Sequence, residues 1–440
     1  MRAAPLRVFS AQPGPTMTPA AASDAHIQNA RAYALPRVHE ASRRRSLAPD
    51  PLLLSMFPPS EPEAARACGL CGGALSATLA AAEAGTARPA PGSRVQPSVD
   101  LPLAIRGVAV DKYVDDELLW LVHSIRKHRL RAGSGCERIQ IVDLGCGFGT
   151  RPWRLPFSSN VAWLDVDLPA VLEEKTALLA AAGAEIHPPE LHCDLRKQPA
   201  GAAGGGGGGS GGHGAGHGGG HGGAPAGAAQ HPLRVGSYSP VVCHMLKGNL
   251  AEVLQAHGWD PAQPTIWVAF ALIYYLDGRA VNLVMKSVQA ASAAAPCSAF
   301  VGTIMNAGMV EMLQESVAAA AAGAQAEARA AGQEPPQPST ADITATVDPA
   351  TSTDISDEMR RSSGVQAAAT TIKFGVHRDV PTFLRGFGWE SVEEVTPPDI
   401  DVMYSLYGVA MEYPQELRER MLAKHGHEPA CVVGIGRRGF

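Results

Sequence analysis

Residues 141–150 read Ile-Val-Asp-Leu-Gly-Cys-Gly-Phe-Gly-Thr, an apolar strand that runs into a glycine-rich turn. Gly145 and Gly147 carry no Cβ atom, so the backbone there can turn tightly and approach a ligand closely. A second apolar run, 161–164, ends in Asp165-Val166-Asp167. An acid at that point can accept hydrogen bonds from both hydroxyls of a ribose. Together the two motifs predict a nucleoside site at the carboxyl ends of parallel strands.

The glycine turn also discriminates between cofactors. A dinucleotide fold needs the third glycine of G-x-G-x-x-G, where the helix packs near the pyrophosphate, but this sequence has Thr150 there and its extra glycine at Gly149. Asp143, just before the turn, has no role against a pyrophosphate. S-adenosylmethionine carries no phosphate and needs an acid for its ribose and polar groups around its amino-acid part. The turn therefore favours S-adenosylmethionine, with an NAD(P)-dependent oxidoreductase or a purely structural glycine turn as alternatives.

The rest of the pattern predicts an α/β fold. Asp115-Asp116-Glu117 precedes an apolar run that ends in Arg126-Lys127, an order that suits the dipole of a helix. Helical patterns such as 169–182 alternate with apolar runs. Strands are expected at 139–144, 161–164, 185–191, 265–273, 299–304 and 431–435. This alternation is typical of a doubly wound, mostly parallel sheet with helices on both faces.

Composition divides the chain into three parts. Residues 1–22 carry two arginines and no acid, which fits either an organelle transit peptide or a disordered extension. Residues 23–100 form a helical and then low-complexity segment, and 101–440 form the main domain. Two stretches inside it, 200–229 and 316–353, have little apolar content to pack, so we expect them to be surface insertions.

Several classes of partner are disfavoured. The formal net charge of −5 gives no reason to expect nucleic-acid binding, and no run of about 18 uncharged apolar residues predicts a membrane span. Cys68 and Cys71 lack a second pair at metal-ligand spacing, and His213, His217 and His221 stand among glycines that disfavour a helix. We therefore predict no metal site and a cytoplasmic or organellar location with reduced thiols.

From Val142 to Leu155, and again from Leu164 to Pro169, the sequence resembles the leucine carboxyl methyltransferase family. That family's pattern is close to L-G-A-G-x-D-T-R-x-[WY]-R-L, followed by E-V-D-x-P. The resemblance covers roughly residues 101–310 and 370–437, outside the insertions. Further ordered matches fall at 112–116, 193–196, 257–261, 264–267, 273–276 and 386–389.

The resemblance implies a class I (Rossmann-like) methyltransferase fold with S-adenosylmethionine as cofactor. Asp167 would hold the ribose, with Asp165 as the other acid of the strand end, and Asp194 and Leu195 would flank the adenine. Thr150 and Arg154 would support the turn. The cofactor-binding residues expected on these grounds are Gly145, Gly147, Asp165, Asp167, Asp194 and Leu195.

Three family positions differ in this chain. The acid of the fourth-strand motif falls on Phe270, the aspartate of the glycine turn falls on Gly149, and an arginine expected to face the methionine carboxylate falls on Val110, next to Asp111. Arg106 or Lys112 could replace that arginine, although neither is aligned with it. These differences favour an alternative, a catalytically degenerate methyltransferase fold that serves as a binding or scaffold protein.

Methyl transfer from a sulfonium expels a neutral thioether, so a carboxylate acceptor needs no general base, and positioning and desolvation can supply most of the rate. The sequence consequently designates no catalytic side chain. A hydroxyl acceptor would need a base, for which His192 is a candidate. We expect O-methyl transfer to a carboxylate or a small-molecule oxygen, a small-molecule or protein carboxylate as acceptor, and a monomeric enzyme.

Overall fold

The computed structural model describes isolated positions between 27 and 41, and then residues 49–57, 103–133, 138–186, 230–312 except 248, 314–315, 372–396 except 378, 399, 415–427 and 429–440. The two predicted insertions, the 1–22 segment and the cysteine pair at 68 and 71 lie outside these residues. Within them, no helix is both long and apolar enough to cross a membrane.

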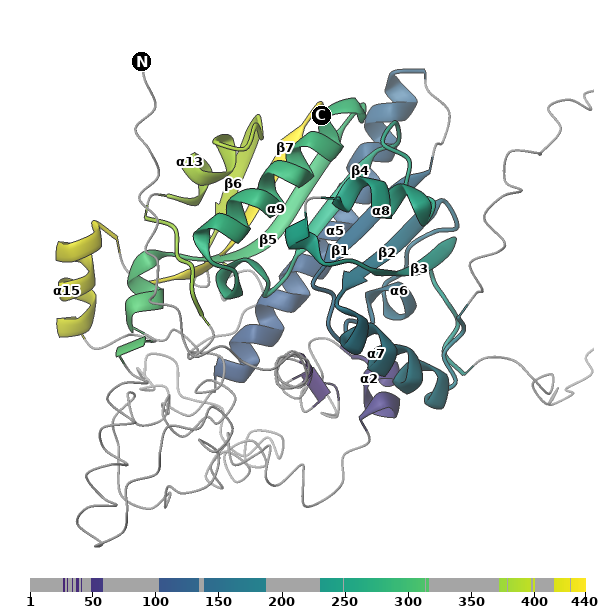
Figure 1. Ribbon diagram of the computed structural model, residues 1–440, viewed down its shortest axis with the longest axis horizontal. Helices are drawn as coiled ribbons and strands as arrows, with labels where there is room; N and C mark the ends of the chain where they lie inside the picture. Colours follow the sequence, from purple (N-terminus) through teal and green to yellow (C-terminus); the bar gives the residue numbers. More distant parts are fainter. Residues whose placement is uncertain are drawn as a thin grey trace, which may run out of the picture.

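The core of the protein is a seven-stranded sheet with the order β3-β2-β1-β4-β5-β7-β6 (Figure 1). Strands β1 to β5 are parallel to one another, whereas β7 is antiparallel to both β5 and β6. The chain order therefore reverses on the two sides of β1, which opens a crevice for ligands at the carboxyl ends of the strands. The strands are β1 (Ile139–Leu144), β2 (Val161–Asp167), β3 (Ser237–Val242), β4 (Thr265–Ala269), β5 (Ser298–Met305), β6 (Ser391–Val395) and β7 (Cys431–Arg438).

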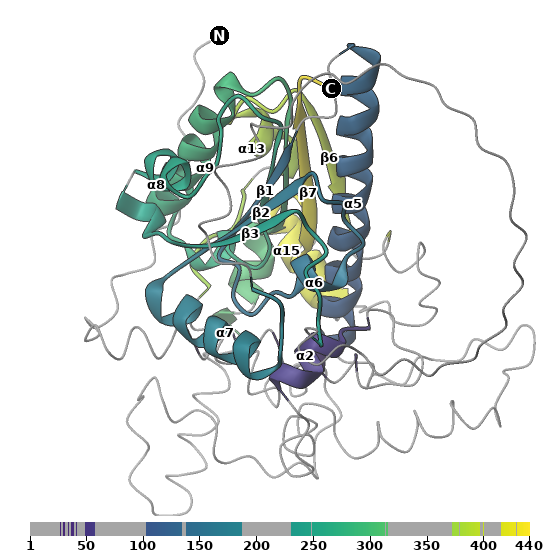
Figure 2. The same ribbon diagram turned by 90° about the vertical axis from the view of Figure 1, so that its right-hand side faces the viewer.

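Helices cover both faces of the sheet. The long helix α5 (Leu103–Arg131) lies along one face, and α8 (Leu250–Ala256), α9 (Gly278–Ala291) and α13 (Val380–Arg385) lie against the other (Figure 2). Successive side chains of a strand point to opposite faces of the sheet. In β1, Ile141 packs in the core beneath α5 and Val142 packs in the core beneath α9. The arrangement confirms the predicted doubly wound α/β fold.

Shorter helices complete the edge of the sheet where β1 and β2 end. They are α2 (Pro51–Met56), α6 (Arg151–Arg154) and α7 (Pro169–Ala181), and a last helix, α15 (Gln415–His425), precedes β7. The side chains of Leu52, Leu53 and Met56 on α2 are buried in the same core as α5 and β1. The N-terminal segment thus contributes directly to the packing of the main domain.

Three predicted elements differ from the structure. The helix expected to begin near Asp115 begins at Leu103, and Asp115 is buried as an ion-pair partner instead of capping a helix. The strand expected at 265–273 ends at Ala269 and is followed by a turn of 3-10 helix at Ile273–Tyr275. The third strand is Ser237–Val242, not 185–191: residues 185 and 186 are not in a strand, and 187–191 lie outside the described residues.

Candidate cofactor site

The glycine turn leads from β1 into α6 and lies against the end of β2. Gly145 and Gly147 have positive φ angles of 67° and 48°, in the left-handed region that favours glycine. The N–H of Gly145 donates to the carbonyl of Val166 at 2.8 Å, which closes the turn onto the second strand. A Cβ atom at Gly145 would lie 2.9 Å from Cδ1 of Leu272, so a side chain there would have to displace that leucine in addition to adopting the positive φ.

Asp167, the last residue of β2, faces this turn. Its Oδ2 accepts the N–H of Gly147 at 2.9 Å, and its Oδ1 accepts the N–H of Leu168 at 2.8 Å. Burial raises the pKa of the Asp167 carboxyl, while the two backbone donors lower it. A carboxylate can accept about four hydrogen bonds, so each oxygen keeps room for one more donor. The predicted ribose acid is therefore held rigidly at the strand end.

Asp165, two residues earlier, has a different environment. Its oxygens accept Nε1 of Trp163 at 2.8 Å, Nζ of Lys175 at 2.5 Å and the hydroxyl of Tyr238 at 2.7 Å. All of these groups are buried, and the carboxylate raises the pKa of Lys175 against the opposing effect of burial. This arrangement gives Asp165 a structural role. Of the two acids predicted for the ribose contact, only Asp167 remains a candidate.

The adenine residues expected from the sequence, Asp194 and Leu195, lie outside the described residues. Among the described residues, the segment that follows the third strand is the one that begins after Val242. Val242 is in register with Asp167, and the N–H of Cys243 donates to the Asp167 carbonyl at 3.1 Å. Val242 and Leu246 are 51 % and 41 % exposed, so the end of β3 presents exposed apolar side chains.

Sequence reasoning missed this stretch because a long glycine-rich segment separates it from β2. The signal that could have found it is the run Tyr238–Val242, which has the length and composition of a buried strand and directly precedes a helical pattern. A strand predicted at Tyr238–Val242 would have placed the residues after it, Cys243 to Lys247, at the carboxyl ends of the strands, where this architecture binds ligands.

The end of β4 carries two unusual residues. Ala271 adopts a positive φ of 55°, which costs a residue with a side chain about 1 kcal/mol, and its N–H donates to Oγ1 of Thr303 at 2.7 Å. Phe270 stands where the family has an acid, and its ring lies 5.1 Å from the guanidinium carbon of Arg151. An apolar ring and an arginine therefore take the place of the expected carboxylate.

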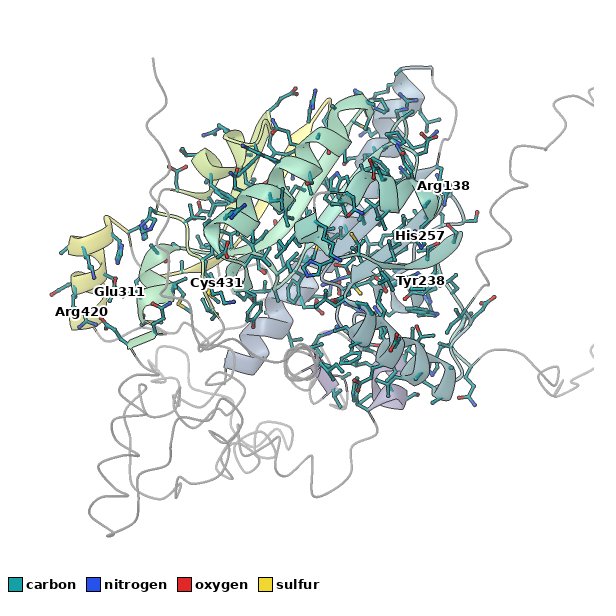
Figure 3. The ribbon with its side chains drawn as sticks, viewed as in Figure 1. Arg138, Tyr238, His257, Glu311, Arg420 and Cys431 are labelled. Atoms are coloured by element: carbon teal, nitrogen blue, oxygen red, sulfur yellow. The ribbon has the colours of Figure 1, made fainter. Side chains whose placement is uncertain are left out.

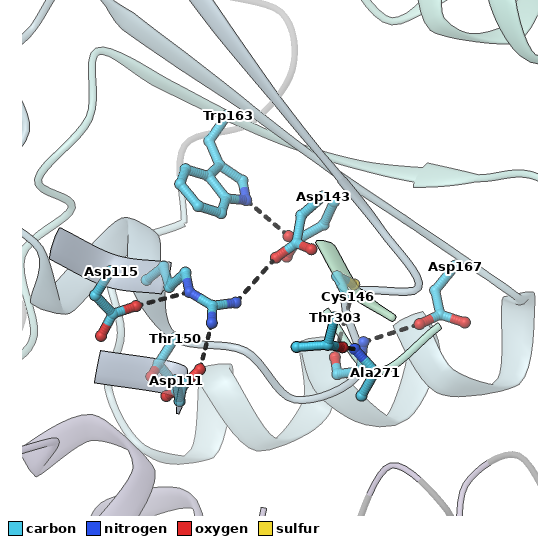
Figure 4. Close-up of polar contacts among 12 residues, drawn as sticks. Asp111, Asp115, Asp143, Cys146, Thr150, Trp163, Asp167, Ala271 and Thr303 are labelled. Carbon is cyan, nitrogen blue, oxygen red and sulfur yellow. Dashed lines mark hydrogen bonds and ion pairs between the residues drawn. The ribbon is translucent and has the colours of Figure 1, made fainter. Parts of the chain in front are cut away.

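A buried charge network surrounds that arginine. It consists of Arg37, Arg151 and Arg154 together with Asp50, Asp111, Asp115 and Asp143. Figure 4 shows Asp111, Asp115 and Asp143 arranged around one guanidinium, which is that of Arg151. The network joins the N-terminal segment, α5, β1 and α6, so it fixes the glycine turn against the long helix.

The network also bears on the missing family arginine. Asp111, beside Val110, is paired with Arg37, Arg151 and Arg154, and these arginines hold its pKa at about 2 against the effect of burial. Lys112 pairs instead with Asp116 one helical turn away. The side chain of Arg106 lies outside the described residues. Arg37, from the N-terminal segment, also reaches this position: its Nε lies 2.9 Å from Oδ2 of Asp111.

Asp143 is the least neutralised member of the network. Its Oδ2 lies 3.7 Å from Nη1 of Arg151, beyond hydrogen-bond distance. Burial raises the pKa of its carboxyl to about 7, Arg151 and Lys175 oppose that shift, and Asp165 and Asp111 reinforce it.

The ion pairs of Glu311 with Lys424 and His425 lie on the side of the molecule away from Tyr238 and are separate from this site (Figure 3).

A reversed strand order about β1, a glycine turn at its end and an acid at the end of β2 define a class I, Rossmann-like methyltransferase fold. Residues 30–289 match the family described as leucine carboxyl methyltransferase, and the chain belongs to that family. The family is as predicted from the sequence.

Curated relatives carry matching names. A "Putative S-adenosyl-L-methionine-dependent methyltransferase" of Mycobacterium tuberculosis is 27 % identical over 153 residues, covering 35 % of this chain and 33 % of the relative. One of the same name from Mycobacteroides abscessus is 28 % identical over 168 residues, covering 37 % of each. The matches span about a third of these relatives.

The solved structures that match this chain are more distant in sequence. A "putative methyltransferase" from Thermobifida fusca is 14 % identical with a TM-score of 0.32, and covers 85 % of this chain and 93 % of that one. A "putative O-methyltransferase" from Nostoc punctiforme is 9 % identical with a TM-score of 0.30, and covers 84 % and 72 % of the two chains.

The environment of Asp165 leads to a prediction about stability. Asp165→Asn would leave Lys175 buried without its counter-charge, and breaking a buried pair in this way costs about 3–5 kcal/mol. We expect a clear fall in the melting temperature. Cofactor affinity of the protein that remains folded should change less than twofold, as measured by calorimetry below the transition. A large loss of affinity at unchanged stability would contradict the structural role.

Proposed function

We propose that this chain binds S-adenosylmethionine at the carboxyl ends of β1, β2 and β3, and transfers its methyl group to an oxygen of a carboxylate or a small molecule. The observation that carries the proposal is the contact between Gly147 and Asp167, which aligns a rigid carboxylate with a turn open to close approach. Family membership supports the choice of cofactor.

The residues present fit the cofactor in two of its parts. Asp167 keeps acceptor capacity for the two ribose hydroxyls after binding two backbone N–H groups. Val242 and Leu246 offer an apolar surface to the flat adenine ring directly beside that acid. The bound cofactor would supply a methyl group on a sulfonium, and the chain would supply position and exclusion of water.

The acceptor side is proposed at the ends of β4 and β5. Buried apolar residues gather there in one cluster, namely Tyr274, Met305, Met309, Val310, Met312 and Ile372. An apolar wall strips water from a carboxylate nucleophile, which raises its reactivity toward a sulfonium methyl. This suits an acceptor that needs no general base. His192, the base predicted for a hydroxyl acceptor, lies outside the described residues.

A second candidate is a degenerate fold that binds partners without transferring a methyl group. The observation in its favour is the end of β4, where Phe270 packs against Arg151 in place of the family acid. The two candidates differ in one property that is simple to measure, which is turnover after cofactor binding has been demonstrated.

The turnover experiment uses the full-length protein, methyl-labelled S-adenosylmethionine and a fractionated extract as the source of acceptor. We expect label in an acceptor fraction and its release as methanol in mild base, because a methyl ester hydrolyses there whereas an ether does not. Base-stable label would move the acceptor from a carboxylate to a hydroxyl. Binding without any transfer would support the scaffold function.

The role of Asp167 gives a prediction about affinity. Asp167→Ala should weaken S-adenosylhomocysteine binding by about 10- to 100-fold, because a charge-assisted hydrogen bond is worth roughly 1.5–3 kcal/mol. The melting temperature should fall slightly, since two backbone donors also lose their acceptor. Asp277→Ala is the matched control, because Asp277 caps α9 through the N–H of Ala280 and should affect stability alone. Equal affinities of the two variants would place the ribose elsewhere.

The adenine surface gives a separate prediction. Leu246→Ser should weaken S-adenosylhomocysteine binding about three- to tenfold while leaving the melting temperature unchanged, because the side chain is 41 % exposed without ligand. Leu130→Ser, which alters an exposed leucine at the end of α5, serves as control and should change neither quantity. Wild-type affinity in the Leu246 variant would remove the end of β3 from the site.

A further inference from the structure

Three histidines lie together where the last helix joins the final strand. His377 lies in the segment before α13, His425 ends α15, and His427 comes two residues later. The ring centroids of His377 and His425 are 6.5 Å apart, and those of His425 and His427 are 5.9 Å apart. Three side chains that change charge near neutral pH therefore share one small region, outside the cofactor site described above.

α15 packs on the helix that follows β5, whose described residues are 307–312 and 314–315. Met421 on α15 is completely buried. A Cβ atom at Gly308 would lie 3.7 Å from Cβ of Met421 and 3.6 Å from Cδ2 of His425, so the two helices are in close contact. The helix after β5 also contributes three residues to the apolar cluster at the ends of β4 and β5. α15 thus covers a helix that forms part of the proposed acceptor side.

Ion pairs join the same two helices. Glu311 pairs with Lys424, and its Oε2 lies 2.9 Å from Nε2 of His425. Glu315 pairs with Arg420 at 2.5 Å. Figure 3 labels Glu311 and Arg420 at this contact. Slight burial raises the pKa of the Glu311 carboxyl, but its hydrogen bonds with Lys424 and His425 bring it below the usual value. Glu311 therefore stays charged at pH 6 and can pair with a protonated His425.

His427 has no comparable partner. Both of its ring nitrogens are buried, and neither has a hydrogen-bond partner among the described residues. A protonated imidazole donates from both nitrogens, so a charge on His427 would leave two buried donors unsatisfied. Burial, together with the charges of His425 and His427, lowers the pKa of His377. The closed arrangement of these segments consequently disfavours a proton on His427 or His377.

Besides these ion pairs, the carboxyl of Glu394 on β6 acts on His427. Burial raises the pKa of Glu394, a backbone hydrogen bond at Val380 and the charge of His427 lower it, and Asp379 raises it. No hydrogen bond joins Glu394 to the ring of His427, because both ring nitrogens of His427 lack one in the described part of the chain. Glu394 therefore does not supply the acceptor that a protonated His427 would need.

We propose that α15 is an acid-sensitive cover of the acceptor side, closed while His427 and His377 are neutral and opened when they gain protons. Opening separates α15 from the helix after β5 and brings the charged rings into water. Because the opened state binds more protons, the closed state loses stability as the pH falls through about 6.5, the usual pKa of histidine. His425 opposes the effect, since Glu311 stabilises its charge in the closed state. The consequence for methyl transfer rests on the function proposed above.

Hydrogen exchange followed by mass spectrometry tests the cover in the full-length protein. Opening of α15 is measured from its backbone amides at pH 8 and pH 6, after correction for intrinsic exchange rates, with α9 as the internal reference. A histidine that must stay neutral in the closed state increases the opening equilibrium about fourfold between these two pH values. We expect about that increase for α15 of the wild type and none for α9.

Three variants assign the increase to particular side chains. His427→Phe keeps a flat ring that cannot gain a proton, and should reduce the increase to less than about twofold. Glu311→Gln removes the acid that stabilises a charged His425, and should make the increase at least about twofold larger than in the wild type. Glu315→Gln is the matched control, because it removes an ion pair between the same two helices that contains no histidine, and should leave the increase unchanged.

The outcomes separate this inference from the proposed function. No increase for α15 of the wild type, or a full increase in His427→Phe, would overturn the cover. If His427→Phe does not fold, Glu311→Gln still decides, because an increase equal to that of the wild type would also contradict the inference. Titration of the wild type with S-adenosylhomocysteine at pH 8 tests cofactor binding separately. A protein with the expected exchange pattern that binds no S-adenosylhomocysteine would retain the cover and lose the proposed function.

Discussion

The buried carboxylate of Asp165 is the interaction on which the rest of the site depends. It accepts hydrogen bonds from Trp163 on β2, Lys175 on α7 and Tyr238 on β3, so one anion holds three elements together. The turn after β1 is tied to the same strand by the hydrogen bond from Gly145 to Val166. With these elements fixed, Asp167 can present its carboxylate at the strand end without depending on a flexible loop.

A second group of buried charges orients the other half of the site. Arg151 and Arg154 follow the glycine turn directly and are paired with Asp111 and Asp115 on α5. Arg37 extends these contacts to the N-terminal segment. Such pairs contribute little net stability, because desolvation offsets much of their attraction, but their directional bonds favour one arrangement over others. They make the N-terminal segment a wall of the same domain.

The departures from the family pattern look different in the sequence and in the structure. In the sequence, Phe270 and Gly149 are two separate positions at which a family acid is missing. Taken alone, they favour a methyltransferase fold that has lost its catalytic activity. In three dimensions the Phe270 ring lies 5.1 Å from the Arg151 guanidinium carbon, and a Cβ atom at Gly149 would lie 3.8 Å from Oδ2 of Asp143, so both positions adjoin the buried charge network. The two differences therefore share one environment in the folded chain.

The sequence by itself determined the fold class, the family and the position of the glycine turn, because apolar runs and glycines mark most buried strands and tight turns in the local sequence. It also determined that an acid ends β2. Only the tertiary structure showed that Asp165 is tied to Lys175 whereas Asp167 faces the glycine turn, because the two acids stand on the same strand end and differ in what packs around them. Likewise, only strand pairing placed β3 after the insertion and Val242 beside Asp167, because long-range hydrogen bonds leave no mark on local sequence.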